Sequence, residues 1–415
     1  MSPRFMVALD LGKQTHVGYV YDTTQRQLSK PLRIKVEQAD FLSFESQLRR
    51  YSNQPSDFLI GHEATGHYGE TLLRRLRAAG YPIVELNGRQ VAEFRRGLGR
   101  RAKTDKLDAE AMARQLATGE FQPTLPPSPT QQALQRMSRL REDLVKEQTR
   151  WLNRLRSLLD QTCPELSLIL PDLTKATVLA VLQRFPSGQA LAQASVDELT
   201  VVIHQASRGQ KGQEFAQQLQ TIAANTVGFS DPWLETEVQL VVSHLQGLGA
   251  HLRTIEAQII SLSQTFLAEI SAHLGLSQAL TNQDFPWDGP LALGTLLAEI
   301  GDIRRFASIK HLLSFLGWCP YSRDSGTKRP TGLKMSHQGN RFARRMLWMM
   351  AINVVQRVPE YQVYYQQRLQ AGKNKMKSLV AVGRKLLSVI YAILKSGQPY
   401  DPQRYLQRQQ ASAKG

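Results

Sequence analysis

The sequence predicts an α/β domain at the start of the chain, then long helices, and finally a compact basic domain that is also helical. Short apolar runs alternate with helical patterns over residues 5–117. Prolines at positions 123, 126, 127 and 129 then interrupt the pattern and indicate a boundary. Beyond them helical periodicity predominates, and positive charge is concentrated after residue 300. We therefore expect three parts, 1–125, 126–285 and 286–415.

The first part alternates strand and helix signals. Strands are expected at 5–11, 16–21, 32–36, 58–60 and 83–86, and helices at 41–51, 68–79, 90–97 and 105–116. Three strands followed by alternating helices and strands are typical of an α/β domain.

Two long helices are expected in the middle part, at 131–162 and 234–270. Apolar residues of the second helix recur in steps of three and four, at Leu234, Val238, Val241, Leu245, Leu248, Leu252, Ile255, Ile259, Leu262 and Phe266. This spacing is typical of a coiled-coil seam. The seam could join copies of the chain in a homo-oligomer, or it could be the buried side of a long helix in an internal bundle. We expect the first arrangement, self-association through this helix.

The last part combines four expected helices, at 291–299, 311–316, 342–355 and 377–394, with a loop at 320–339. Residues 301–415 hold 21 Lys and Arg against four Asp and Glu, whereas the rest of the chain holds 31 of each. This one region therefore accounts for the whole net charge of +17. A basic face confined to one domain favours a polyanionic partner, and nucleic acid is the partner we expect.

Four acidic residues of the first part are spaced as a metal site requires. Asp10 and Glu63 each follow a short apolar run that is expected to be a strand, and Asp105 and Asp108 lie three apart in a helical pattern, so they face the same side. Taken singly, each acid could be a turn or capping residue. Together, carboxylates at strand ends and on one helical turn can hold two Mg²⁺ ions, and such a pair flanks the attacking and leaving oxygens of a phosphodiester.

Basic residues and serines complete the candidate chemistry. Arg100, Arg101 and Lys103 precede the last two acids and could hold a phosphate backbone. In the C-terminal loop, Ser325 lies beside Gly326, and Ser336 is a rival hydroxyl that could instead cap the following helix. The cations that could bind nucleic acid around these serines are Arg323, Lys328, Arg329, Lys334, Arg341, Arg344 and Arg345.

Several classes of protein are disfavoured. Cys163 and Cys319 are the two cysteines, and their separation matches neither a disulfide framework nor a zinc ribbon. The first apolar run is short and contains Asp10, and the most apolar later stretch, residues 346–355, is about half a membrane span. We expect a cytoplasmic protein without a membrane partner.

These motifs resemble a known family. The set Asp10, Glu63, Asp105 and Asp108 is similar to the signature of DEDD-type serine transposases, the bridge-RNA-guided recombinases of the insertion-sequence one-hundred-and-ten family. The C-terminal runs at 315–320, 324–326, 335–340 and 395–401 are similar to that family's later motifs, in the same order. The resemblance covers about 1–160 and 286–405.

The resemblance implies a RuvC-like, RNase H-like first domain, a coiled-coil linker and a helical transposase domain. It implies that the four acids bind Mg²⁺, two ions per site, and that Ser325 is the nucleophile that becomes joined to DNA. It also implies a dimer or tetramer, assembled on a structured non-coding guide RNA that pairs with donor and target DNA.

Two other functions stay open. The chain could be a RuvC-like junction nuclease that hydrolyses DNA with water at the metal site and needs no serine. It could also be a non-enzymatic scaffold that binds nucleic acid through the long helices and the basic domain. Replacing Ser325 would not stop cleavage by the nuclease, and replacing Asp10 would change nothing in the scaffold.

Overall fold

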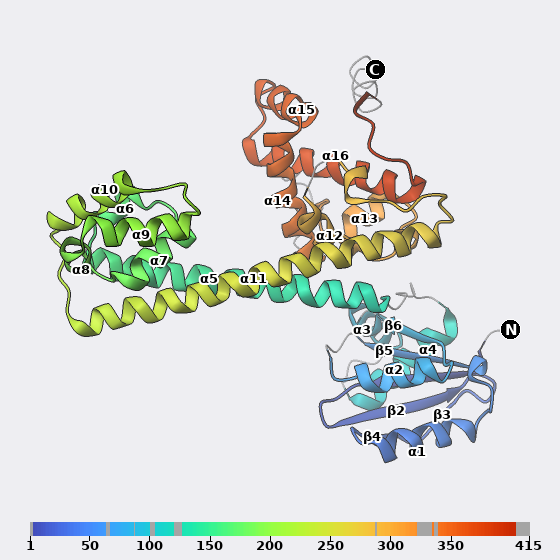
Figure 1. Ribbon diagram of the computed structural model, residues 1–415. Helices are drawn as coiled ribbons and strands as arrows, with labels where there is room; N and C mark the ends of the chain where they lie inside the picture. Colours follow the sequence, from blue (N-terminus) through green and yellow to red (C-terminus); the bar gives the residue numbers. More distant parts are fainter. Residues whose placement is uncertain are drawn as a thin grey trace, which may run out of the picture. The chain divides into compact units, whose positions relative to one another are not determined.

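A computed structural model of the 415-residue chain describes residues 3–63, 67–86, 88–99, 104–119, 127–286, 289–321, 334–335 and 339–403. The chain separates into two compact units, Met1–Ser128 and Pro129–Gly415 (Figure 1). The first unit holds a mixed sheet, and the second is built almost entirely of helices. The expected change from an α/β domain to helical structure is therefore confirmed.

The first unit is organised by one sheet. Its strands are β1 (Phe5–Asp10), β2 (Thr15–Asp22), β3 (Gln27–Leu28), β4 (Leu32–Lys35), β5 (Phe58–Glu63) and β6 (Ile83–Leu86). The strand order is β3-β2-β1-β5-β6, and β4 also pairs with β2. Strand β1 is antiparallel to β2 but parallel to β5, and β5 is parallel to β6. The carboxyl ends of β1, β5 and β6 therefore share one edge of the sheet.

Helices cover both faces of this sheet. Side chains of a strand alternate between its two sides, so the apolar strands present an apolar surface on each face. The helices are α1 (Gln38–Arg49), α2 (Glu70–Ala78), α3 (Gly88–Gly97) and α4 (Asp105–Thr118), with a short 3₁₀ turn, η1, at Pro55–Asp57. Val7 and Leu9 of β1 pack with residues of α1 and α2. Met6 and Ala8 point the other way and pack with residues of α3 and α4.

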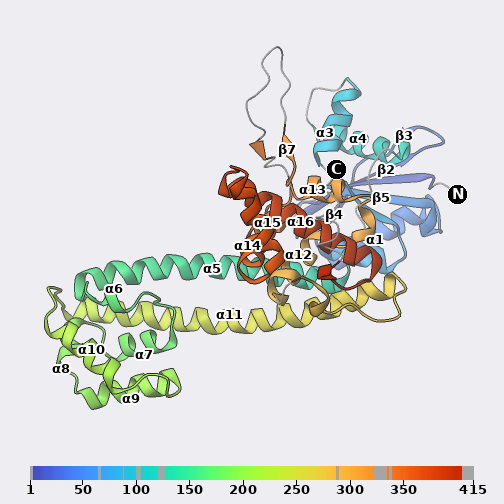
Figure 2. The same cartoon turned by 90° about the horizontal axis from the view of Figure 1, so that it is seen from above.

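Two long antiparallel helices run through the second unit, α5 (Pro129–Thr162) and α11 (Pro232–His273). Figures 1 and 2 show them side by side from two directions. Salt bridges join Arg141 to Glu256 at 2.6 Å and Arg154 to Glu237. From the first pair to the second, the residue number rises along α5 and falls along α11, so the two helices run antiparallel.

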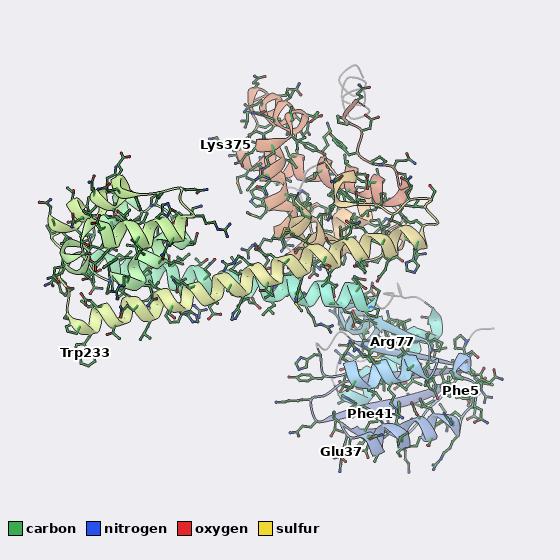
Figure 3. The ribbon with its side chains drawn as sticks, in the orientation of Figure 1. Phe5, Glu37, Phe41, Arg77, Trp233 and Lys375 are labelled. Carbon is green, nitrogen blue, oxygen red and sulfur yellow. The ribbon has the colours of Figure 1, made fainter. Side chains whose placement is uncertain are left out.

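The helical stretch between α5 and α11 forms a subdomain at one end of this pair. Its helices are α6 (Leu166–Ile169), α7 (Ala176–Arg184), α8 (Gly188–Gln193), α9 (Val196–Ser207) and α10 (Gln213–Ala224). Their apolar residues share one core with Leu155 and Leu159 of α5 and with Val241 and Leu245 of α11. Trp233, at the start of α11, stays 83% exposed and points outward (Figure 3).

The other end of the pair carries the C-terminal helices, which share a second core with α11. These elements are α12 (Pro290–Ile300), α13 (Ile309–Phe315), α14 (Arg341–Arg357), α15 (Pro359–Gln370) and α16 (Lys375–Ser396), the 3₁₀ turns η2 (Asn282–Asp284) and η3 (Ile303–Arg305), and the short strands β7 (Pro320–Tyr321) and β8 (Lys334–Met335). Trp318 is buried against Gly383 of α16, where a methyl group would lie 2.7 Å from the indole ring.

The α11 seam is buried within the chain itself. Val241, Leu245 and Ile259 are each at most 2% exposed, and α11 packs along α5 and α12. The internal-bundle alternative therefore accounts for this seam, and the apolar spacing gives no separate argument for an interface between copies. None of the helices in the described ranges combines the length and apolar character needed to cross a bilayer.

Two glycines in the second unit test how tightly α11 is packed. A methyl group at Gly247 of α11 would meet nothing within 4 Å, so Gly247→Ala should raise the free energy of unfolding by about 0.5–1 kcal/mol through better helix propensity. A methyl group at Gly294 of α12 would lie 2.6 Å from Cβ of Ser263, so Gly294→Ala should lower it by about 1–3 kcal/mol. Thermal unfolding of both variants checks this, and equal shifts would show that α12 does not pack closely on α11.

Candidate functional site

Asp10 and Glu63 end two neighbouring parallel strands. Leu9 of β1 pairs with His62 of β5, so the next residue on each strand, Asp10 and Glu63, lies at the same level of the sheet. Neighbouring strands are about 4.8 Å apart. Alternation puts Asp10 on the side of Ala8, which packs with residues of α4, and Glu63 on the side of Gly61. Both carboxylates therefore emerge on the face that α4 covers, at one edge of the sheet.

The first residue of α3 accommodates the Glu63 carboxylate. A methyl group at Gly88 would lie 2.9 Å from Oε2 of Glu63 and 3.3 Å from its Cδ. The carboxylate thus rests directly against the N-terminus of α3, where the helix dipole favours negative charge. Gly88 leaves the space that this approach needs.

Asp108 lies in the first turns of α4 and pairs with an arginine. Nη1 of Arg95, from α3, is 2.7 Å from Oδ1 of Asp108, and the two side chains are only 11% and 25% exposed. Thr104 caps α4 by accepting a hydrogen bond from the amide of Leu107 at 3.3 Å. Asp105 is the first residue of the helix, one turn before Asp108, but its side chain lies outside the described part of the structure.

The donor chemistry at this edge suits a hard cation. Asp10 and Glu63 bring two carboxylates together, and carboxylate oxygens are the ligands that Mg²⁺ prefers. Among the side chains that the structure describes, however, no three carboxylate, histidine or cysteine groups gather closely enough to hold an ion. Arg95 neutralises the charge of the Asp108 carboxylate through its contact with Oδ1.

The histidines beside Glu63 contact other groups of the same chain. His62 is 5% exposed, and its Nδ1 lies 3.0 Å from the carbonyl oxygen of Glu63. Burial lowers the pKa of His62, so its ring is neutral near pH 7. His67 stacks on Tyr68 with their ring centroids 4.6 Å apart.

Most of the expected nucleic-acid contacts lie outside the described residues. These are Arg100, Arg101, Lys103, Arg323, Lys328, Arg329 and the side chain of Lys334, together with Ser325 and its rival Ser336. The three expected arginines near the start of α14 are described. Arg341 is exposed over the ring of Phe342, Arg345 pairs with Glu142 at 2.8 Å, and Nη1 of Arg344 donates to the carbonyl of Leu316 at 3.4 Å.

Two residues of structural interest were not expected from the sequence. Gly88 gave no signal, because its contact with Glu63 joins elements that are far apart in the sequence. Glu299 did give a signal: it is the one charged residue in the apolar helix α12, and it is buried. A buried acid on an apolar helix needs a hydrogen-bonding partner, and Arg139 is that partner.

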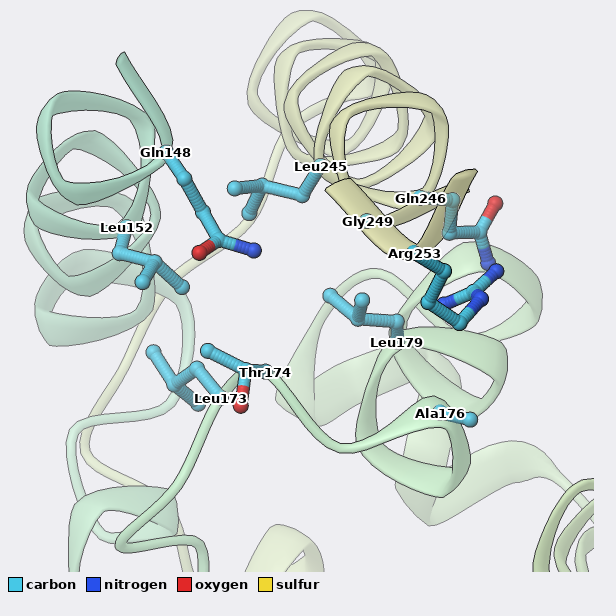
Figure 4. Close-up of a pocket in the computed structure, with 10 residues that line it drawn as sticks. All are labelled: Gln148, Leu152, Leu173, Thr174, Ala176, Leu179, Leu245, Gln246, Gly249 and Arg253. Carbon is cyan, nitrogen blue, oxygen red and sulfur yellow. The ribbon is translucent and has the colours of Figure 1, made fainter. Parts of the chain in front are cut away.

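A cavity of about 200 Å³ lies between α5, α7 and α11 (Figure 4). Leucines form much of its wall, Gln148 and Gln246 contribute amide groups, and Arg253 contributes a cation. The lining holds no carboxylate, histidine or cysteine, so it offers neither a metal ligand nor a strong base. The cavity therefore differs in its donor chemistry from the sheet edge that carries Asp10 and Glu63.

Both units match known families. Residues 7–164 match the IS110-type DEDD family, described as "Transposase", and residues 286–366 match the family described as "Transposase IS116/IS110/IS902 family". The two matched regions together span more than half of the chain, and they occur in the same order as the acidic and C-terminal motifs.

Relatives extend the similarity over nearly the full length. The chain is 28% identical to the IS110 uncharacterized 43.6 kDa protein of Streptomyces coelicolor, covering 95% of each chain. It is 25% identical to the IS116 uncharacterized 44.8 kDa protein of Streptomyces clavuligerus, covering 96% of each. It is also 34% identical to the pilin gene-inverting protein of Moraxella bovis over 117 residues, which is 28% of this chain and 36% of that protein.

The contact between Gly88 and Glu63 gives a test of the candidate metal site. Gly88→Ala should displace the Glu63 carboxylate and weaken Mg²⁺ binding by roughly 10-fold, the scale expected for residues that support a ligand. Gly97→Ala is a matched control in the same helix, because a methyl group there meets nothing within 4 Å. Titration calorimetry with Mg²⁺ measures both variants, and equal affinities would exclude a supporting role for Gly88.

Proposed function

Because the chain belongs to the IS110 family of transposases, we propose that it cuts and rejoins DNA when an insertion sequence moves. The observation that carries this proposal is the placement of Asp10 and Glu63 at the ends of adjacent parallel strands, within the region that matches the DEDD family. The gene-inverting relative adds support, since inversion of a gene requires DNA strands to be both cut and rejoined.

We infer that the first unit is an RNase H-like, RuvC-like domain. The strand order supports this inference: antiparallel strands β2 and β1 are followed, across the sheet, by β5 and β6, which run parallel to β1. Such a sheet brings carboxylates from two strand ends together beside a helix that crosses the same face.

Asp10, Glu63, Asp105 and Asp108 would hold Mg²⁺, with two ions per site. The ions would supply positive charge beside the reacting phosphate. The protein's own part is to keep Asp10 and Glu63 at one edge of the sheet and to keep Arg95 beside Asp108 until that carboxylate binds metal. Arg100, Arg101 and Lys103, just before α4, would hold the DNA backbone next to these acids.

Ser325 is the proposed nucleophile. Its Oγ forms a bond to the phosphorus of a DNA phosphodiester, the bond from phosphorus to the leaving DNA hydroxyl breaks, and the serine proton passes to a base outside this loop. A DNA hydroxyl later attacks the phosphoserine and restores a phosphodiester. The covalent link conserves the bond energy for rejoining, and nearby cations such as Arg323, Lys328 and Arg329 would stabilise the charge that develops.

The proposed partners are donor DNA, target DNA and a structured non-coding RNA that pairs with both. The concentration of net charge after residue 300 supports a nucleic-acid partner. We also propose that a dimer or tetramer assembles on the RNA, with the acids of one copy facing Ser325 of another. The main alternative is a junction nuclease that hydrolyses DNA with water at the same acids.

A nicked duplex that spans one end of the element tests these mechanisms. With RNA transcribed from the non-coding DNA beside the gene, the native protein should form a covalent adduct that maps to the peptide containing Ser325. Ser325→Ala should abolish the adduct, Asp10→Asn should abolish cleavage, and the control Ser336→Ala should retain the adduct. Cleavage by Ser325→Ala without an adduct would replace the serine mechanism with metal-dependent hydrolysis, and unchanged activity without the RNA would exclude guidance.

The arginines of α14 test the nucleic-acid surface. Arg341 has no ion pair among the described residues, whereas Arg345 is held by Glu142. Arg341→Gln should therefore reduce the log–log salt slope of DNA binding by roughly 0.7–0.9, the value for one lost phosphate contact. Arg345→Gln should change the slope less. Binding curves at several salt concentrations measure both slopes, and an unchanged slope for Arg341→Gln would exclude a phosphate contact at that residue.

A further inference from the structure

The buried carboxylate of Glu299 has no part in the proposed chemistry. Its side chain is only 1% exposed. Arg139 of α5 donates from Nε to one carboxylate oxygen of Glu299 at 2.9 Å and from Nη2 to the other at 3.0 Å. This bidentate pair raises the pKa of Arg139, so the guanidinium stays charged. The carboxylate is thereby held in one orientation at the end of α12.

Glu299 also reaches the start of α14 through Asn340. Nδ2 of Asn340 donates to Oε2 of Glu299 at 2.7 Å. The other end of the same amide, Oδ1, caps α14 by accepting hydrogen bonds from the backbone amides of Phe342 and Ala343, each at 3.0 Å. The backbone amide of Asn340 donates to the carbonyl of Phe315 at 2.9 Å. Asn340 therefore joins α12, α13 and α14.

These contacts lie where the chain returns from the segment 322–333. The paired strands β7 and β8 hold the two ends of that segment side by side, with Tyr321 opposite Lys334. Before β7, Nε1 of the buried Trp318 donates to the carbonyl of Val380 at 3.0 Å. After β8, Gly339 has a φ of +127°, and a methyl group there would lie 2.6 Å from the carbonyl oxygen of Phe315.

We propose that Glu299 is a positioning residue, which fixes Asn340 and thereby the point at which the chain returns from the segment that holds Ser325. This inference rests on the proposed serine chemistry. An ion pair with a buried carboxylate adds little stability compared with well-packed apolar side chains, so stability alone is a weak reason for burying Glu299 here. Its hydrogen bonds are directional, however, and both oxygens of Glu299 are committed to fixed donors.

An exchange of donor and acceptor between Glu299 and Asn340 separates positioning from capping. Asn340→Asp keeps an N-cap of equal quality, but it places a second carboxylate at hydrogen-bond distance from Glu299. The double variant Glu299→Gln with Asn340→Asp restores this hydrogen bond in the opposite direction, because the amide NH2 at position 299 donates to the carboxylate at position 340. That NH2 cannot accept from Nη2 of Arg139, so Arg139 keeps only the hydrogen bond from Nε to the amide oxygen.

The test measures formation of the covalent serine–DNA adduct in a single turnover, with the full-length protein and the nicked duplex described above. Asn340→Asp should slow adduct formation by about 10- to 100-fold, the range for a displaced reactive group, and the double variant should recover part of that loss. The dissociation constant for the duplex should stay within about 2-fold of the native value in both, because neither position contacts DNA in this proposal. Thermal unfolding of each variant is recorded alongside.

Three results would contradict the inference, and they are distinguishable. Native-like adduct formation by Asn340→Asp would exclude a positioning role for Glu299 while leaving the serine mechanism intact. A slow single variant that the double variant does not rescue, with an equal loss of thermal stability in both, would reduce the contact to a structural role. Failure of the native protein itself to form any adduct would reject the serine mechanism and this inference together.

Discussion

The antiparallel contact between α5 and α11 is the constraint on which the second unit depends. Neither helix can bury its apolar side alone, and each contributes to a core at both ends of the pair: residues of the C-terminal helices at one end and of α6 to α10 at the other. Cross-helix salt bridges such as Arg141 to Glu256 then select one register among several that the apolar spacing would allow. Because Arg139 lies on α5 itself, the same register also delivers its guanidinium to Glu299.

Two ion pairs in this protein illustrate different uses of charge. The pair of Arg95 and Asp108 joins α3 to the first turns of α4, with Nη1 of Arg95 2.7 Å from Oδ1 of Asp108 and side chains that are 11% and 25% exposed. The pair of Arg139 and Glu299 is buried on the carboxylate side and is completed by Asn340, so any exchange would leave a charge without a partner in a poorly solvated place. Its bidentate pairing and its third donor suit this second pair to a fixed geometry.

Local patterns predicted much of this fold. The expected strands at 16–21, 32–36 and 83–86 match β2, β4 and β6 closely, and the long helices were located to within a few residues. The two-residue strand β3 and the helix α15 were missed, the first because it is too short to show periodicity and the second because its tyrosines and glutamines form no clear apolar side. Periodicity also could not identify the partner of the α11 seam, because identical spacing serves an intermolecular coil and an internal bundle.

The candidate site was only partly predictable for a related reason. The strand-end positions of Asp10 and Glu63 follow from local pattern, since an acid after an apolar run emerges at the end of a strand. Contacts between distant elements do not follow from pattern: Arg95 on Asp108, Gly88 under Glu63 and Asn340 on Glu299 each join residues from separate elements.

The helical subdomain of α6 to α10 also depends on a contact between residues that are distant in the sequence. The two ends of this subdomain lie together, because the backbone amide of Phe229 donates to the carbonyl of Gln161 at 2.9 Å. The chain therefore leaves α5 and approaches α11 at almost the same point. A connection of this kind is modular: equal numbers of turns can be added to or removed from α5 and α11 without changing the register at the opposite end, so the length of this helix pair can change independently of the two cores that it joins.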